Sequence, residues 1–367
     1  MKTAIFLCLA FIGHAAMAQQ ERAENIFIIT TDGFRWQEVF TGADSALIND
    51  PDYVRDTSLM RQIYWDGSPE ERRKRLMPFF WNVIAKKGQL YGNRLFENKV
   101  DVKNIYKISY PGYNELLTGY ADPFPIFNTP TLNRNKTVLE FLNERKEYRD
   151  KVIAFSSWYI FPFLLNTTRN GLPVNSGYEL MDGRTTDSSA QIAAVQENIR
   201  NKTHTRYDLL TYLTAREYIQ ANHPRVVYIS LGETDEFAHQ GRYDLYLEQA
   251  ANVDRMIGEL WYYTQTDPFY KNRTTFLITT DHGRGKKPAK WTTHNGLVGG
   301  SGQIWLALLG NGIEAAGEVR EAGKIGQNQV AATIAALLGE RFAPTARTAE
   351  PIRLPQPVWT MLTSLSK

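Results

Sequence analysis

Two apolar segments, about 250 residues apart, end in nearly the same way. Residues 27–33 read FIITTDG and residues 276–283 read FLITTDHG, so each β-prone run stops at an aspartate with a glycine close behind. A third run, residues 226–231, leads directly into GETDEFAH, residues 232–239. The carboxyl ends of parallel strands form the edge of an α/β sheet at which ligands bind. The three runs therefore predict that acidic side chains from distant parts of the chain meet at one sheet edge.

Histidines accompany these aspartates. His239 follows Asp235 by four residues, His282 follows Asp281 directly, and His294 lies in the segment TTHNG. Sets of Asp and His with an open position suit Zn²⁺ when thiolates are absent, although ligand type alone also allows Mn²⁺ or another divalent ion. We therefore predict a site for two divalent metal ions, with the candidate ligands Asp32, Asp235, His239, Asp281, His282 and His294.

The first 18 residues have the pattern of a secretory signal peptide. Lys2 gives a basic start, residues 4–13 are mostly apolar, and Ala16-Met17-Ala18 resembles a cleavage site. The single cysteine of the chain, Cys8, lies in this segment, so the mature protein is expected to contain no disulfide, cysteine nucleophile or thiolate ligand. We expect an exported protein, periplasmic or secreted, with residues 1–18 as signal peptide.

Composition gives no support for nucleic-acid binding or for a membrane span. A formal net charge of +3 without a basic stripe gives no nucleic-acid-binding signature. No later segment is long and apolar enough to predict a membrane span. The remaining expectation is a small-molecule substrate, and the sequence gives no indication of oligomeric state.

Strand-like and helical patterns alternate along the rest of the chain, which predicts an α/β fold with a sheet covered on both faces. Because the candidate ligands come from both ends, we expect a single domain over residues 19–367, with insertions at about 44–74 and 157–190. The polar segment 44–74 is expected to be a surface excursion with little regular structure. Strands are expected around 88–95, 102–108, 151–156, 225–231, 274–280 and 303–309, and helices at 76–86, 137–147, 190–200, 207–221, 242–264 and 328–338.

Ser109 stands between the strand-like residues 102–108 and a predicted short helix that contains Pro111 and ends before Gly119. The position of Ser109 allows two roles. Ser109 is either an N-cap, the usual role of a serine before such a helix, or a nucleophile whose hydroxyl is activated by a neighbouring metal ion.

These motifs together resemble the alkaline phosphatase superfamily, and most closely its type I phosphodiesterase/nucleotide pyrophosphatase branch. The resemblance spans residues 26–296 and implies an alkaline-phosphatase-like three-layer α/β/α sandwich with a largely parallel central sheet. It assigns one metal ion to Asp235, His239 and His294, and the other to Asp32, Asp281, His282 and Ser109. The implied reaction is hydrolysis of a phosphoric ester through a covalent phospho-Ser109 intermediate, which a metal-bound hydroxide then hydrolyses.

Departures from the superfamily patterns bear on the substrate. Tyr113 stands where the sulfatase signature requires an arginine, which counts against a sulfatase. The segment after residues 151–155, where related monoesterases carry cations, instead contains Trp158 and no Lys or Arg, which favours a phosphodiester. The resemblance places an asparagine near the phosphate, either Asn128 or Asn114. A phosphomonoesterase, a sulfate or phosphonate hydrolase on the same scaffold, and a non-catalytic metal-stabilised binding protein remain alternatives.

Overall fold

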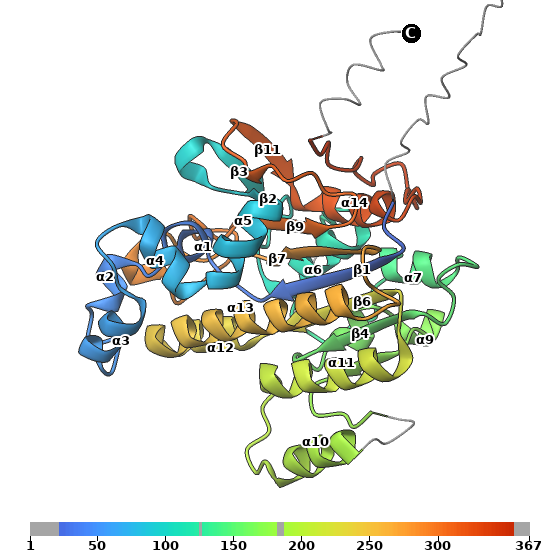
Figure 1. Ribbon diagram of the computed structural model, residues 1–367, viewed down its shortest axis with the longest axis horizontal. Coiled ribbons are helices and arrows are strands. Elements are labelled where there is room, and N and C mark those ends of the chain that lie inside the picture. Colours follow the sequence, from blue (N-terminus) through green and yellow to red (C-terminus); the bar gives the residue numbers. More distant parts are fainter. Residues whose placement is uncertain (1–21, 125–126, 182–186, 356–367) are drawn as a thin grey trace, which may run out of the picture.

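The computed structural model describes residues 22–124, 127–181 and 187–355. The predicted signal peptide, residues 1–18, lies outside them. Eight strands form the central sheet in the order β10-β2-β9-β7-β1-β6-β4-β5 (Figure 1). Neighbouring strands from β7 to β5 are parallel, whereas β9 runs antiparallel to both β7 and β2. A largely parallel α/β sheet was predicted, and the structure confirms it.

The strand bounds differ from the predicted ones mainly at the ends. The central sheet contains β1 (Asn25–Thr31), β2 (Gly88–Tyr91), β4 (Val152–Ser156), β5 (Val174–Ser176), β6 (Val226–Leu231), β7 (Thr274–Thr279), β9 (Leu306–Gly310) and β10 (Gly317–Glu318). A second sheet of three strands contains β3 (Asn98–Asp101), β8 (Gln303–Ile304) and β11 (Gly323–Gly326).

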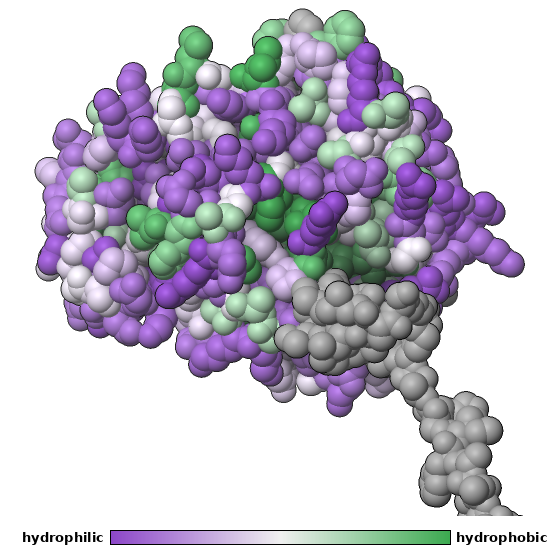
Figure 2. Space-filling model, turned by 90° about the horizontal axis from the view of Figure 1, so that it is seen from above, coloured by the Kyte–Doolittle hydropathy of each residue, from purple (hydrophilic) through white to green (hydrophobic). Residues whose placement is uncertain are grey.

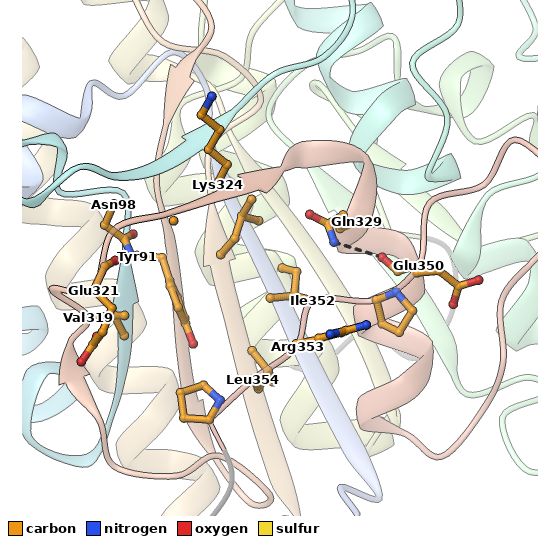
Figure 3. Close-up of a pocket in the computed structure, with 14 residues that line it drawn as sticks. Tyr91, Asn98, Val319, Glu321, Lys324, Gln329, Glu350, Ile352, Arg353 and Leu354 are labelled. Atoms are coloured by element: carbon orange, nitrogen blue, oxygen red, sulfur yellow. Dashed lines mark hydrogen bonds between the residues drawn. The ribbon is translucent and has the colours of Figure 1, made fainter.

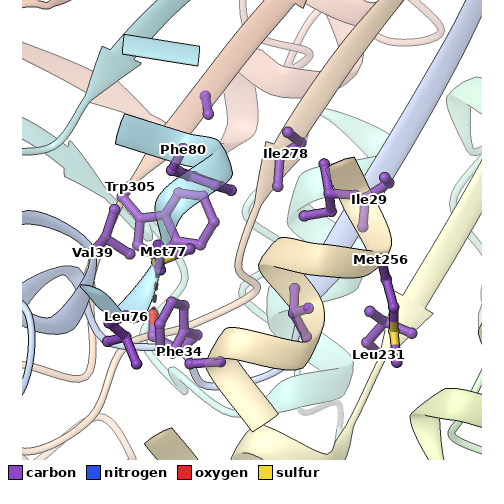
Figure 4. Packing of buried hydrophobic residues seen from close by; sticks show 14 of the residues in the cluster. Ile29, Phe34, Val39, Leu76, Met77, Phe80, Leu231, Met256, Ile278 and Trp305 are labelled. Carbon is purple, nitrogen blue, oxygen red and sulfur yellow. Dashed lines mark hydrogen bonds between the residues drawn. The ribbon is translucent and has the colours of Figure 1, made fainter. Parts of the chain in front are cut away.

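The central strand β1 is buried along its whole length, and its side chains alternate between two cores. Phe27 and Ile29 belong to one hydrophobic cluster, whereas Ile26 and Ile28 belong to the other. Figure 4 shows the first cluster, in which Ile29 lies with residues of the neighbouring strands and of the covering helices. A strand that is apolar on both faces requires helices on both sides, and this gives the three layers.

The helices divide between the two faces according to these clusters. The cluster of Phe27 includes residues of α1 (Trp36–Thr41), α11 (Asp208–Asn222), α12 (Glu233–His239) and α13 (Tyr243–Thr266). The cluster of Ile26 includes residues of α6 (Ser109–Thr118), α7 (Val138–Asn143), α8 (Phe161–Leu164) and α14 (Val330–Leu337). No helix in the described ranges is long and apolar enough to cross a membrane.

The prediction of little regular structure in residues 44–74 is wrong. This segment forms the short helices α2 (Ser45–Ile48), α3 (Thr57–Tyr64) and α4 (Pro69–Leu76). Asp44, Asp56 and Ser68 each precede one of them, and their side chains accept hydrogen bonds from first-turn backbone N–H groups. The polar residues that suggested a loop are therefore N-caps, which satisfy the otherwise unpaired helix N-termini.

Two further segments differ from expectation. Residues 102–108 were predicted as a strand, but the strand β3 ends at Asp101 and an irregular stretch leads to Ser109. Lys107 there has a positive φ of 51°, which is incompatible with a strand. The predicted insertion 157–190 contributes β5 to the edge of the central sheet, together with α8 and α9 (Thr167–Asn170). The remaining elements are η1 (Phe80–Ile84), α5 (Ala85–Lys87), η2 (Arg94–Phe96), α10 (Asp187–Asn198), η3 (Pro288–Lys290) and η4 (Gln327–Gln329).

A buried carboxylate joins α13 to the segment before β2. Asp254 accepts hydrogen bonds from the backbone N–H groups of Phe79 and Phe80, at 2.7 and 2.9 Å. Burial raises the pKa of Asp254 to about 7. Between pH 4 and pH 7 the folded protein therefore keeps a proton that the unfolded chain releases, so the free energy of unfolding falls as the pH rises through this window.

We predict that Asp254→Asn removes this dependence. The wild type is expected to lose stability, on the order of 4 kcal/mol, between pH 4 and pH 7, because Asp254 must ionise while buried. Denaturant unfolding across this pH range measures the loss. The exposed cap variant Asp56→Asn should retain the wild-type dependence, and an equal slope in Asp254→Asn would show that other groups cause it.

Candidate metal centre

The three neighbouring strands at the middle of the sheet deliver the acidic residues. β1 lies between β7 and β6, with Thr30 opposite Thr279 and Thr31 opposite Leu231. All three strands are parallel, so the residues that follow them emerge at the same edge. Asp32 follows β1, Asp281 follows β7, and Asp235 lies in the first turn of α12 after β6. The sheet therefore brings together the aspartates that the sequence predicted.

Four residues form the first candidate cluster, and all of them are buried. His282 Nε2 lies 3.3 Å from Asp32 Oδ1 and 3.3 Å from Asp281 Oδ2. Ser109 Oγ lies 3.5 Å from Asp32 Oδ1 and 3.3 Å from His282 Nε2. Asp32, Asp281 and His282 offer donor atoms close enough together to hold one metal ion.

The second cluster adjoins the first on the side of α12. His239 Nε2 lies 3.0 Å from His294 Nε2 and 3.1 Å from Asp235 Oδ2. The imidazole ring of His294 stacks on that of His282 with a centroid separation of 3.7 Å, so the two clusters are in contact. Asp235, His282 and His294 form a second group that could hold an ion. The structure therefore brings together all the ligands predicted from the sequence.

The unpaired donor atoms of these clusters fit divalent cations. Asp281 Oδ2 is buried and accepts no hydrogen bond from any residue that the structure describes. His282 Nδ1 donates to the carbonyl of Gly283 at 3.0 Å, and His294 Nδ1 donates to the carbonyl of Lys107 at 3.1 Å. These bonds leave the Nε2 lone pairs free, as in histidines that bind metal ions. Bare lone pairs and carboxylate oxygens at such distances repel one another unless a cation lies between them.

The pKa shifts of the buried carboxyl and imidazole groups also favour cation binding at this site. Burial, reinforced by the charge of Asp235, raises the pKa of Asp32 well above its usual value. Burial and the charge of Asp32 similarly raise the pKa of Asp281. Burial, together with His282, holds the pKa of His294 well below its usual value, which keeps its imidazole neutral. Burial therefore disfavours the ionised forms of Asp32 and Asp281, and a bound cation would stabilise those forms.

The structure decides against the N-cap interpretation of Ser109. The N-cap position of α6 is Ile108, and no side chain makes a cap hydrogen bond there. Ser109 is the first residue of the helix, and its hydroxyl instead points toward Asp32 and His282. Helix α6 approaches the site closely because residue 112 is glycine, since a Cβ there would lie 2.6 Å from the carbonyl oxygen of Asp281.

The candidate substrate residues have different surroundings. Asn128 Oδ1 accepts a hydrogen bond from Tyr110 N at 2.9 Å, which places its amide beside Ser109, and its Nδ2 donates to no group within the described ranges. The Asn114 side chain is buried and accepts a hydrogen bond from Asn133 Nδ2 at 3.0 Å, so its contacts favour a structural role. Trp158 is partly exposed and lies against Tyr113, with ring centroids 6.5 Å apart.

Arg284 is a site residue that the sequence analysis did not include among the candidates. Its side chain is fully buried and forms an ion pair with Asp235 Oδ1. Its Nε donates to the carbonyl of Trp291 at 2.8 Å, and its Nη2 donates to that of Thr292 at 2.6 Å. Burial opposes ionisation of Asp235, but Arg284 together with His294 and His239 outweighs this effect and holds the pKa of Asp235 well below its usual range.

Tyr113 is a second contact that the sequence did not assign. Its hydroxyl donates to Asp32 Oδ2 at 3.1 Å and accepts from Ser230 Oγ at 3.2 Å. The tyrosine at the position of the sulfatase arginine therefore orients a candidate metal ligand. No pattern of spacing signals such a contact, because the two residues come from different elements.

A separate hollow of about 690 Å³ lies away from this site. It is lined by residues of β2, β11 and the C-terminal segment, including Tyr91, Lys324 and Ile352 (Figure 3). Figure 2 views the molecule from above, and on this face apolar residues gather in a hollow within a mostly hydrophilic surface. None of the candidate metal ligands lines the hollow of Figure 3, so we place the chemistry at the carboxyl edge of the sheet.

We predict that Asp281→Asn separates metal binding from folding. Zn²⁺ should raise the melting temperature of the wild type and raise that of Asp281→Asn much less, because a carboxylate ligand is lost. Without metal, the variant should melt at a higher temperature than the wild type, because one of the mutually repelling buried charges is gone. Thermal unfolding with Zn²⁺ or with chelator measures both effects. The exposed variant Asp56→Asn should behave like the wild type, and an undiminished metal shift in Asp281→Asn would contradict the assignment.

We also predict that Arg284→Met lowers the affinity for one of two ions by about 10- to 100-fold, because Asp235 and the segment before His294 lose a common partner. Competition with a chromophoric chelator measures each affinity, and circular dichroism reports whether the variant folds. Arg284→Lys should be intermediate, since it keeps the charge but cannot bind both carbonyl groups. Lys287→Met, an exposed change in the same loop, is the control. Wild-type affinities in Arg284→Met would remove Arg284 from the site.

Comparisons with known proteins agree with this architecture. Residues 191–340, which include Asp235, His239, Asp281, His282 and His294, match the Metalloenzyme superfamily. No curated protein sequence matches the chain.

Solved structures show the fold more widely. The wild-type alkaline phosphatase PafA has a TM-score of 0.57 and 10% identity, over 90% of this chain and 98% of that one. A protein of the alkaline phosphatase superfamily from Vibrio parahaemolyticus has a TM-score of 0.52 and 12% identity, over 92% and 72%. A 2-O GAG sulfatase has a TM-score of 0.55 and 11% identity, over 90% and 73%. The chain therefore has the alkaline-phosphatase-like fold, and residues 191–340 match a superfamily of metal-dependent enzymes.

Proposed function

We propose that this protein is an exported hydrolase of phosphoric esters that uses two divalent metal ions and a covalent phospho-Ser109 intermediate. The observation that carries the proposal is the position of Ser109 Oγ, which lies 3.3 Å from His282 Nε2 and 3.5 Å from Asp32 Oδ1. This hydroxyl does not cap its helix and instead faces two candidate metal ligands. The export part of the proposal rests on the sequence of residues 1–18 alone.

The ligand sets that we propose are those implied by the superfamily resemblance. Asp235, His239 and His294 would hold one ion, and Asp32, Asp281, His282 and Ser109 would hold the other. Zn²⁺ is the ion we propose, with Mn²⁺ as the alternative that the same nitrogen and oxygen donors accept. Bound divalent ions would supply Lewis acidity, which favours the ionised hydroxyl of Ser109 and offsets the charge of the transferred phosphoryl group.

The residues of the chain perform the remaining tasks. Ser109 Oγ loses its proton and attacks phosphorus, and one ester oxygen leaves on the opposite side and takes up a proton, which gives an alcohol and a phosphorylated Ser109 that keeps the second ester group of a diester. Asn128 holds the first turn of α6 through Tyr110 N, and its Nδ2 is available to donate to a phosphate oxygen. Water then attacks phosphorus of this intermediate, which releases a phosphate monoester from a diester substrate and restores the serine hydroxyl.

A diester is the substrate that the surroundings favour. Three arginines near the carboxyl edge, Arg35, Arg206 and Arg284, are buried in the described residues, and protein contacts hold all three guanidinium groups. Arg35 is paired with Glu38. Arg284 contacts Asp235 and two backbone carbonyl groups, while Arg206 donates to Asn175 and Thr211. The partly exposed Trp158 offers an apolar surface instead, which suits a second organic group better than a second phosphate charge.

Ser109→Ala provides the test, with three aryl esters that share one leaving group: a phosphate monoester, a methyl phosphate diester and a sulfate. Wild-type protein reconstituted with Zn²⁺ should turn over the diester fastest. Ser109→Ala or chelator should lower that rate by at least about 10³-fold, because the nucleophile or its activation is lost. The conservative variant Ser109→Thr should retain part of the activity, since either hydroxyl supports the reaction.

Four other outcomes of this assay would change the proposed substrate or mechanism. Faster monoester turnover would mean that cations such as Lys107 reach the substrate. Faster sulfate turnover would favour the sulfatase activity that one of the similar structures has. Turnover that persists in Ser109→Ala would exclude the covalent route. If the metal-loaded protein hydrolyses none of the three esters, the proposal fails and a metal-stabilised binding protein is favoured.

A further inference from the structure

Three loops touch one another around the entrance to Ser109. A Cβ added at Gly296 would lie 2.2 Å from the carbonyl oxygen of Ile105, so the loop after His294 packs directly on the loop before Ser109. The ring of Tyr106 contacts that of Phe127, with centroids 6.4 Å apart, which joins the loop of Asn128 to the same assembly. We call these loops, residues 103–108, 127–132 and 294–300, the rim.

The rim carries large apolar side chains that face solvent. Leu297 is 99% exposed, Ile105 is 67% exposed and Phe127 is 58% exposed. Single exposed apolar residues are ordinary on protein surfaces, but three of them on touching loops beside one site form a group. Each lies within three residues of a group that contacts the site: His294, Lys107 or Asn128. The entrance to the candidate site is therefore bordered by apolar tips.

Cations lie next to these tips. Lys286 N donates to the carbonyl of Gly299 at 3.1 Å, so the basic loop runs alongside the rim. Lys286, Lys287 and Lys290 are all exposed, and none forms an ion pair within the part of the chain that the structure describes. The acidic residue near Phe127, Asp122, is paired with Arg134. The three lysines therefore place unpaired positive charges beside the rim.

We propose that the rim docks on the surface of an anionic lipid bilayer, and that the substrates are phosphoric esters of lipids held there. Apolar tips on separate loops, with lysines beside them, fit a surface in which acyl chains lie just below anionic headgroups. Docking in this orientation sets the Ser109 hydroxyl against the headgroup layer, where the ester bonds of such lipids lie. The choice of substrate rests on the proposed hydrolase function, whereas the docking itself does not.

Vesicle binding by the full mature protein tests the docking without any substrate. Vesicles of phosphatidylcholine alone are compared with vesicles that contain phosphatidylglycerol, at low and at physiological salt. The wild type should bind the anionic vesicles, and binding should weaken with salt, because exposed charges are screened. Lys286→Gln/Lys287→Gln/Lys290→Gln should bind them more weakly by about fivefold for each lysine.

The apolar tips are tested by Leu297→Ser/Ile105→Ser, which should lower binding at least about tenfold. The control is Leu95→Ser/Tyr262→Ser, which removes side chains that are 67% and 72% exposed but lie away from the rim, in η2 and late in α13. The control should bind as the wild type does. Wild-type circular dichroism spectra and melting temperatures in both double variants show that they fold.

The outcomes separate the two proposals. A wild type that binds neither vesicle, or an equal loss in the rim variant and in its control, overturns the docking and leaves the hydrolase proposal standing if the aryl diester is cleaved. Selective vesicle binding without hydrolysis of any ester upholds the docking and overturns the hydrolase. Selective binding, with faster cleavage of a vesicle-borne phosphodiester than of the same headgroup ester in solution, supports both. Rim-dependent capture of another protein without vesicle binding would replace the bilayer by a protein partner.

Discussion

The repulsion between buried carboxylates is the constraint around which this structure is organised. Parallel pairing of β7, β1 and β6 brings Asp281, Asp32 and Asp235 to one edge, and all three side chains are largely removed from water. Three negative charges in such a place strongly destabilise the fold unless they are compensated. The chain compensates part of this charge itself, through Arg284 on Asp235 and Tyr113 on Asp32. Asp281 Oδ2 has no hydrogen-bond partner among the described residues, so a bound cation would stabilise this carboxylate most.

The protein contacts that hold the site residues also connect separate parts of the fold. Arg284 neutralises Asp235 and also binds the backbone carbonyl groups of Trp291 and Thr292, so one side chain connects α12 to the loop that ends at His294. The hydrogen bonds from His282 Nδ1 and His294 Nδ1 to backbone carbonyl groups fix the orientation of the two imidazole rings. Each bond holds Nε2 toward the cluster. The site is thus held in position by contacts that involve no metal ion.

The sequence allowed the sheet, its two-sided burial and the whole set of candidate ligands to be predicted, because each depends on local patterns. An apolar run followed by Asp or Asp-His marks a strand and the residue after it, wherever the strand pairs. The roles of Arg284 and Tyr113 depend on which loop folds over which strand, and no local pattern carries that information. Residues 44–74 were misjudged for another reason: Asp44, Asp56 and Ser68 look like loop residues until the short helices that they cap are seen.

These capped helices also have a consequence for how such proteins can diverge. The segment leaves the sheet layers after α1 and returns beside its own starting point, since a Cβ at Gly42 would meet the backbone of Arg72 and Arg73 within 2.5 Å. Each helix within the segment has its own start signal and does not depend on its neighbour for capping. A change in one helix therefore leaves the caps of the others intact, but Leu47, Met60 and Leu76 pack in the same core as β1, so these positions must stay apolar. Evolution can rebuild the exposed side of this segment one helix at a time while its core-facing residues, and with them the charged edge of the sheet, stay in place.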